Sequence, residues 1–353
     1  MQDLRATRIV MCLAAAVSCA ALGARLCLPA QAFSQDSPGQ GMGLVWPSPP
    51  TRPVIRYVSS VAGPDQASAR GSLFSRLGKL LSGTSREGLV RPLGVAANRG
   101  ILYVTDPGGH ALLIFDQEQK SFQRIRKADN ANLESPVGVA AGKDRVFLAD
   151  SSLKQIFVYD RRGKFLRKFT DQQPERPTGL AVDEKSGKLY VADTAAHQVR
   201  IYSNDGVLEK VLGKRGTGKG EFNYPTNLWL DGDGSLCVVD SLNYRVQIFG
   251  PDGSFLTEFG HQGDSSGAFA SPKGIAADSS GHIYVVDALF DAVQIFDRQG
   301  QLLLSFGERG TGPGQFWLPS GISIDERNRI YVADSYNQRI QVFEFLGGPD
   351  HGE

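Results

Sequence analysis

The sequence predicts an all-β fold, a six-bladed β-propeller, from three features that recur six times along the chain. Each repeat opens with proline, one variable residue and a small residue; the prolines are Pro92, Pro136, Pro177, Pro225, Pro272 and Pro319. A second strand ends in aspartate, at intervals of 44, 43, 47, 47 and 47 residues: Asp106, Asp150, Asp193, Asp240, Asp287 and Asp334. A third strand ends in an aromatic residue: Phe115, Tyr159, Tyr202, Phe249, Phe296 and Phe343. Repeats of forty-odd residues with several short strands are typical of propeller blades.

The composition agrees with a fold rich in turns. Of 353 residues 41 are glycine, well above the average of roughly 7%. Hydrophobic residues make up 41% and charged residues 21%, as in globular proteins. A small residue follows the variable one in each first strand because backbones approach closely near the axis. Asn227 replaces glycine once, and we expect it to adopt an unusual backbone conformation there.

Residues 1–32 are predicted to be a signal peptide. Arg5 and Arg8 precede an apolar run over residues 9–24, and Pro29-Ala30-Gln31-Ala32 offers a small-residue cleavage site after Ala32. The run is shorter than the roughly 20 residues of a membrane-spanning helix. Alternatively, the segment is a lipoprotein signal, and the protein is anchored by a lipid attached to Cys19. Either reading implies export to the periplasm or the outside of the cell.

Removal of this segment changes the charge and the thiol content of the chain. The segment carries three positive charges, Arg5, Arg8 and Arg25, and one negative charge, Asp3. Its removal therefore changes the formal net charge from +1 to −1. A charge near zero gives no general attraction to nucleic-acid phosphates, which disfavours RNA binding. Only Cys237 remains of four cysteines, so no intrachain disulfide can form. It lies in an apolar strand and is expected to be an inert core thiol.

The remaining elements follow in order along the chain. Residues 33–51 are rich in Pro, Gly and Ser and are predicted to be a linker before a propeller spanning 52–346. A strand over 54–58 is expected to complete the last blade, which otherwise lacks a fourth strand, and so to join the two ends of the ring. A short amphipathic helix is expected at about 73–81 and a tail at 347–353. The fourth strands of the other blades are placed at Ser121–Ile125, Phe165–Phe169, Val207–Leu212, Phe255–Phe259 and Leu302–Phe306.

These motifs resemble those of the NHL-repeat family over about Arg52 to Leu346. The fullest matches are Asp240-Ser241-Leu242-Asn243-Tyr244-Arg245 and Asp334-Ser335-Tyr336-Asn337-Gln338-Arg339, and His110 and His197 fall at the family's histidine position. The second and fifth repeats depart from it, with Leu153-Lys154-Gln155 and Phe290-Asp291-Ala292. The resemblance implies the propeller fold. It leaves the function open, because the family includes protein-binding, RNA-binding and catalytic members.

No catalytic residue and no metal ligand is predicted from the motifs. The strand-end aspartates are expected to accept backbone N–H groups at turns, as Asp commonly does. Zinc-dependent peptide-amidating lyases, a branch that the chain resembles, carry His directly after the blade-opening proline, where this chain has Leu93, Val137, Thr178, Thr226, Lys273 and Ser320. Residues 213–220 imitate a phosphate-binding loop but lack the Ser or Thr after the lysine and a following helix. No cofactor is predicted, although a structural Ca²⁺ or Zn²⁺ in the central channel stays open.

The long loops carry the predicted binding residues. Loops from fourth to first strands and from second to third strands emerge on one face of the ring, and aromatic and arginine side chains are favoured at interfaces. The candidates are Tyr224, Asn227, Tyr244, Arg245, Lys273, Phe290, Asp291, Trp317, Tyr336 and Arg339. We therefore predict an exported, non-catalytic scaffold for a protein, peptide or glycan of the cell envelope. The alternatives are a metal-dependent propeller lyase or hydrolase and, less favoured, an RNA-binding module.

Overall fold

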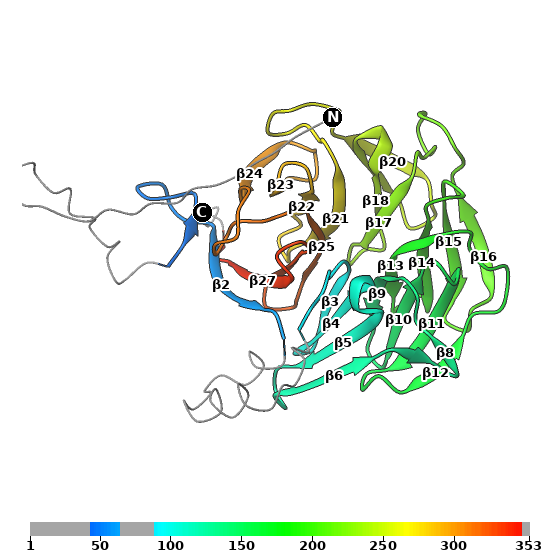
Figure 1. Cartoon of the computed structure of the whole chain (residues 1–353). Helices are drawn as coiled ribbons and strands as arrows, with labels where there is room; N and C mark the ends of the chain where they lie inside the picture. The colour runs from blue at the N-terminus through cyan, green and yellow to red at the C-terminus, as the bar shows by residue number, and fades with distance from the viewer. Residues whose placement is uncertain (1–42, 64–87, 348–353) are drawn as a thin grey trace, which may run out of the picture. The chain divides into compact units, whose positions relative to one another are not determined.

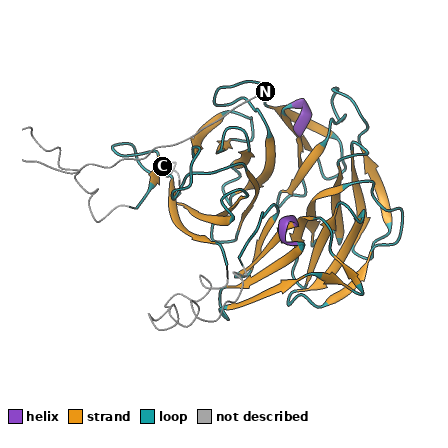
Figure 2. Cartoon of the chain, in the orientation of Figure 1, coloured by secondary structure: helices purple, strands orange, loops and turns teal. Residues whose placement is uncertain are grey.

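The computed structural model describes residues 43–63 and 88–347, and these form a six-bladed β-propeller (Figure 1). Strands and loops make up almost all of it, with two single helical turns, η1 (Pro107–Gly109) and η2 (Ser241–Asn243) (Figure 2). The predicted signal peptide, most of the predicted linker, the helix at about 73–81 and nearly all of the predicted tail lie outside the described residues. Within the described part, no helix has the length and apolarity that a membrane span requires.

Five blades are four-stranded antiparallel sheets in which consecutive strands pair. Blade 1 holds β3 (Val95–Asn98), β4 (Ile101–Asp106), β5 (Ala111–Asp116) and β6 (Ser121–Ile125), and blade 2 holds β9 (Pro136–Ala141), β10 (Arg145–Asp150), β11 (Gln155–Asp160) and β12 (Phe165–Lys168). Blade 3 holds β13 (Pro177–Asp183), β14 (Lys188–Asp193), β15 (Gln198–Ser203) and β16 (Leu208–Leu212). Blade 4 holds β17 (Pro225–Leu230), β18 (Leu236–Asp240), β19 (Arg245–Phe249) and β20 (Phe255–Phe259), and blade 5 holds β21 (Pro272–Ala277), β22 (Ile283–Asp287), β23 (Ala292–Phe296) and β24 (Leu302–Phe306). A small hairpin, β7 (Lys127–Ala128) and β8 (Ala131–Asn132), connects blades 1 and 2.

Blade 6 joins the two ends of the propeller. It holds β25 (Pro319–Ile324), β26 (Arg329–Asp334) and β27 (Arg339–Phe345), and β2 (Ile55–Val61) pairs antiparallel with β27 as the fourth strand. The predicted closure of the ring is thereby confirmed. A fifth strand, β1 (Val45–Trp46), pairs with β2. This strand lies within residues 33–51, which the sequence analysis predicts to be a linker. The Trp46 ring explains this difference, because it packs 5.7 Å from Phe306 and 5.8 Å from Phe343.

The hydrophobic core is divided among the six junctions between neighbouring blades, with one cluster of buried residues at each. The third-strand aromatics are at most 3% exposed and fill these junctions, as the sequence predicts. Burying so large a side chain at every junction stabilises the stack by roughly 1.5–3 kcal/mol per residue. The blades therefore hold one another in place along the whole ring.

The innermost strands approach one another closely at the repeated small residue. A β-carbon added to Gly138 would lie 1.7 Å from the Thr178 carbonyl oxygen, and one added to Gly321 would lie 2.4 Å from that of Leu93. Glycine is required there by space, as expected. Asn227 differs from its prediction, because it is not among the residues with positive φ. Its side chain instead accepts a hydrogen bond from the Leu228 N–H at 2.8 Å.

Candidate functional site

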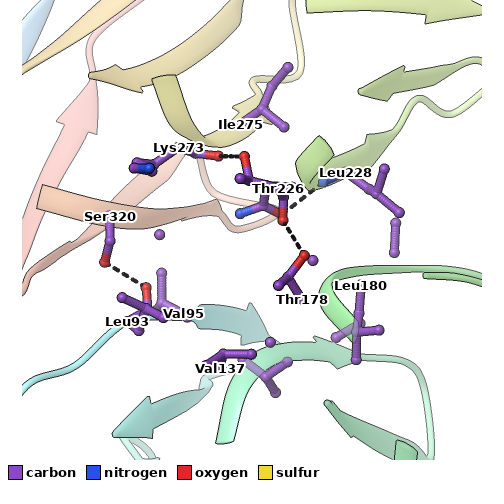
Figure 3. Close-up of a pocket in the computed structure, with 18 of the residues that line it drawn as sticks. Leu93, Val95, Val137, Thr178, Leu180, Thr226, Leu228, Lys273, Ile275 and Ser320 are labelled. Carbon is purple, nitrogen blue, oxygen red and sulfur yellow. Dashed lines mark hydrogen bonds between the residues drawn. The ribbon is translucent and has the colours of Figure 1, made fainter. Parts of the chain in front are cut away.

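A cavity of about 590 Å³ runs along the axis and is lined by the innermost strands of all six blades (Figure 3). The residues that directly follow the blade-opening prolines form a layer that we call the first layer: Leu93, Val137, Thr178, Thr226, Lys273 and Ser320. The next layer is entirely aliphatic: Val95, Val139, Leu180, Leu228, Ile275 and Ile322. Exposed Arg176, Tyr224 and Leu242 also line the cavity, so it opens on the face that carries the long loops.

The hydroxyl groups of the first layer are used to tie neighbouring blades together. Thr178 donates to the Thr226 carbonyl at 3.0 Å, and Ser320 donates to the Leu93 carbonyl at 2.8 Å. Thr226 donates more weakly to the Lys273 carbonyl at 3.4 Å (Figure 3). Because each hydroxyl has one proton to donate, these groups have none left for a ligand in the cavity.

The charge of the cavity lining is positive. Among the described residues that line it, the charged ones are Lys273 in blade 5 and Arg176 at the entrance of blade 3, and none is Asp, Glu or His. Within the described residues, the Lys273 ammonium has no hydrogen bond and no ion pair. Burial lowers the pKa of Lys273, and the negative charge of Asp287 opposes this in part. The lining therefore presents a partly desolvated cation that makes no hydrogen bond or ion pair within the described residues, with Asp287 as the acidic group that acts on it.

The strand-end aspartates are structural, as the sequence predicts. Each is fully buried and accepts one or two backbone N–H groups from the loop that leads into its own blade. Asp287, for example, accepts from Ala270 and Ser271 at 2.8 and 2.9 Å and from Leu289 and Phe290 in the following turn. These carboxylates hold the two kinds of long loop together on one face of the ring.

Two predicted binding arginines are engaged inside the protein. Arg245 pairs with Asp240 at 2.9 Å and with Glu258 at 2.8 Å, and it donates to two carbonyls of the loop that enters blade 4. Arg339 pairs with Asp334 at 2.8 Å and donates to three carbonyls of the loop that enters blade 6. Such forked donors brace a loop and have little left to offer a partner.

Other predicted residues support the loops rather than project from them. Asp291 is 5% exposed and accepts the Leu318 N–H at 2.6 Å, and burial raises the pKa of its carboxyl group. Tyr244 adopts a left-handed conformation with φ of 54° and packs against the core between blades 4 and 5. Phe290 is half-buried, and Asn227 lines the cavity with its side-chain oxygen already bonded.

Five large apolar side chains are exposed on the loop face of blades 4, 5 and 6. They are Tyr224, Leu242, Leu289, Trp317 and Tyr336, with exposed fractions of 38, 49, 64, 39 and 47%, and we call them the apolar crescent. The Trp317 and Tyr336 rings lie 5.6 Å apart, and the Leu242 N–H donates to the Asn223 carbonyl next to Tyr224. In blades 4 and 6 the crescent therefore includes residues from the loops on both sides of the strand-end aspartate, and in blade 5 it includes Leu289 from the loop after Asp287.

Three crescent residues, Tyr224, Trp317 and Tyr336, are among the binding residues predicted from the sequence, whereas Leu242 and Leu289 are not. A signal was available, because Leu242, Leu289 and Tyr336 each stand two residues after a strand-end aspartate. The same position holds Gly108, Ser152 and Ala195 in blades 1 to 3. Comparison of this one position among the repeats separates the two halves of the ring.

The described residues contain no group of three or more His, Cys, Asp or Glu side chains that could hold a metal ion. The histidines at the repeat position serve the loops. His197 is buried, accepts the Tyr224 N–H at 3.2 Å and packs edge-on to the Tyr224 ring. His110 lies 2.6 Å from the Glu134 carbonyl oxygen.

Comparisons with known proteins agree with the fold. A family model described as NHL repeat matches residues 175–202 and 316–343, and the search of curated proteins returned no match. A streptogramin B lyase structure is 14% identical with a TM-score of 0.55, covering 72% of this chain and 94% of that one. An auxiliary nutrient binding protein from Bacteroides thetaiotaomicron is 15% identical with a TM-score of 0.58, covering 74% and 70%. A chain of a nidogen/laminin complex is 19% identical with a TM-score of 0.54, covering 71% and 90%. At these identities the likeness concerns the fold alone.

Proposed function

We propose that this NHL-repeat β-propeller is a non-catalytic scaffold that binds a protein or peptide partner on the apolar crescent. The observation that carries the proposal is the exposure of five large apolar side chains on one half of one face. Soluble proteins rarely expose clustered apolar side chains unless the surface meets a partner. Tyrosine and tryptophan are also the residues that most often dominate the energy of an interface.

The support beneath the crescent favours a protein partner. Trp317 lies on a loop whose backbone is held by Asp334 and Arg339, and the Trp317 N–H donates to Asp334 at 2.8 Å. A surface held in one conformation loses little entropy on binding. Leu242 and Leu289 present aliphatic groups, which suit protein side chains better than the hydroxyl-rich surface of a glycan. A protein or peptide is therefore the preferred partner among those predicted.

We place this binding in the cell envelope, on the strength of the predicted export signal. The single described thiol is compatible with an oxidising compartment, since Cys237 is buried and burial raises its pKa to about 12. A thiol in that state is a poor nucleophile and is slow to oxidise.

The lyase alternative has less support from the residues that line the cavity. A lyase needs an acid and a base placed around its substrate, or a metal with several ligands. The described lining offers a lysine and an arginine but no carboxylate and no imidazole. Likeness of fold to a streptogramin B lyase does not supply these groups.

The proposal is tested by capture from an envelope extract with the purified protein as bait. The crescent variant carries Leu289→Ser and Trp317→Ala, and the matched control carries Ser152→Ala and Ala195→Ser at the equivalent face of blades 2 and 3. We expect the crescent variant to lose partner recovery by about tenfold or more, the effect of removing a central anchor. The control should retain it. Unchanged recovery by a folded crescent variant would remove the proposed surface from consideration.

A further inference from the structure

We propose that the central cavity is a binding site for an aliphatic carboxylate, with the carboxylate at Lys273 and the chain along the axis. This site goes beyond the proposed docking of a protein on the crescent. It would take a small amphiphile with one negative charge. The proposal rests on the size of the cavity, its charge and the distribution of its polar groups.

The size and the walls suit an apolar chain. A volume of about 590 Å³ lies within the range of roughly 300–1,000 Å³ that is usual for small-molecule sites. Val139, Leu180 and Ile275 and their counterparts in the other blades surround the axis, and each is less than 10% exposed. Aliphatic groups bound there would leave water for a surface of the same chemistry.

The charge of the lining selects an anion. Lys273 and Arg176 both line the cavity, and the described lining residues include no Asp or Glu. Asp287, which lies outside the lining, acts on the Lys273 charge but already accepts four backbone N–H groups. A neutral apolar ligand would leave the half-buried ammonium without a partner, which costs free energy. A carboxylate would form a charge-assisted hydrogen bond with it, and such bonds are about twice as strong as neutral ones.

The hydroxyl groups of the first layer are already engaged in hydrogen bonds, whereas the Lys273 ammonium, within the described residues, is not. This difference points to an amphiphilic ligand rather than a sugar. Thr178, Thr226 and Ser320 already donate to carbonyls of the neighbouring blades. A ligand with hydroxyl groups all around it would find few free donors. A ligand with one anionic head and an otherwise apolar body matches what the cavity presents (Figure 3).

The test is a fluorescence titration of the purified propeller with 11-(dansylamino)undecanoic acid, followed by competition with decanoate, decanol and decyl phosphate. We expect saturable binding of one probe per chain, displacement by decanoate, and competition by decanol weaker by about tenfold or more, as expected for loss of a charged hydrogen bond. Probe that does not saturate, or decanol that competes as well as decanoate, would overturn the proposal. Decyl phosphate as the best competitor would overturn the assignment to a carboxylate.

Variants locate the site and separate it from the crescent. Lys273→Met is expected to weaken probe binding by about tenfold or more, while Lys273→Arg keeps the charge and most of the affinity. Lys143→Met, at an exposed lysine outside the cavity, is the matched control. The crescent variant, Leu289→Ser with Trp317→Ala, should bind the probe like the wild type even where it loses its protein partner. Probe binding that is unchanged in a folded Lys273→Met variant would show that the cavity is not the site.

Discussion

The two halves of the ring have the same strands but differently built loops. The loops that enter blades 4, 5 and 6 are each closed by a parallel bridge, Arg215 with Phe222, Gln262 with Phe269 and Arg309 with Phe316. The three phenylalanines are completely buried. The described loops that enter blades 2 and 3 have no such bridge. Three blades thus carry entering loops that are closed by a bridge and anchored by a phenylalanine in the core between two blades.

A single position explains much of this difference. Gln247, Gln294 and Gln341 each stand seven residues after a strand-end aspartate, and each accepts a glycine N–H of the entering loop at 2.9, 2.7 and 2.8 Å. Blades 1, 2 and 3 carry Leu113, Phe157 and Arg200 there. The half whose entering loops carry this glutamine bond is also the half that exposes the crescent, so the bond and the proposed recognition surface occur together.

The largest effect is expected from the strand-end aspartates. Asp334→Ala should destabilise the protein by about 3–5 kcal/mol, because Arg339 would keep a buried charge without its carboxylate. Within the described residues Asp106 accepts backbone N–H groups alone, from Val90, Arg91 and Gly109, so Asp106→Ala should cost about 1–3 kcal/mol. Urea unfolding of both variants measures the difference. Equal losses would show that the arginine brace adds nothing to blade 6.

A smaller effect is expected where the innermost strands meet. Gly138→Ala should cost roughly 1–3 kcal/mol, because the new β-carbon meets the Thr178 carbonyl and the backbone must shift. Asn227→Ala, at the same position of blade 4, should change stability by less, since a β-carbon is already accommodated there. Thermal unfolding of the two variants checks this. A neutral Gly138→Ala would mean that the ring can widen at little cost.

The contribution of the glutamine that holds each entering loop is tested at Gln294. Gln294→Leu leaves the Gly267 N–H and the Ala268 carbonyl without their partner, and we expect a loss of about 1–2 kcal/mol. The loss should be local, so amide exchange at Gly267 should accelerate while amides in blade 2 keep their protection. Exchange that accelerates all around the ring would indicate that the loop is not an independent unit.

The smallest effect is a gain in stability. Lys273→Met removes a half-buried ammonium whose burial outweighs its attraction to Asp287, and it should stabilise the protein by about 1 kcal/mol at pH 7. Burial lowers the pKa of Lys273 below its ordinary 10.5, so the folded state loses the proton first as pH rises. Wild-type stability should therefore rise between the lowered pKa and 10.5, and the advantage of the variant should shrink there. Urea unfolding at pH 7 and pH 10 compares the two; an advantage that grows with pH would contradict this account.

The sequence predicted the ring because its landmarks depend on local patterns that recur six times. Asp334 and Phe343 could be assigned a role from their repeat positions, and the pairing of β2 with β27 followed from a missing fourth strand. The roles of Arg245 and Arg339 were harder to predict, because contacts with carbonyls more than twenty residues away decide whether such a side chain faces inward. Interfaces and braces both favour arginine, so residue type alone does not distinguish them.

Strand β1 and the aliphatic cavity were not predicted from the sequence either, because both depend on contacts between residues that are far apart in the chain. Trp46 belongs to a segment rich in proline and glycine, and only the packing of its ring on Phe306 and Phe343 shows that it extends blade 6. That Lys273 and Arg176 line one cavity depends on the curvature of the ring, which no single repeat encodes.

Site-specific photo-crosslinking measures most directly which half of the face meets a partner. A photoreactive phenylalanine is placed at Leu289 in one protein and at Ser152, its counterpart in blade 2, in another, and both are irradiated in an envelope extract. We expect a discrete crosslinked species from position 289 and none from position 152. Crosslinking to the same partner from 152 alone would place recognition on blades 1 to 3 and contradict the central claim.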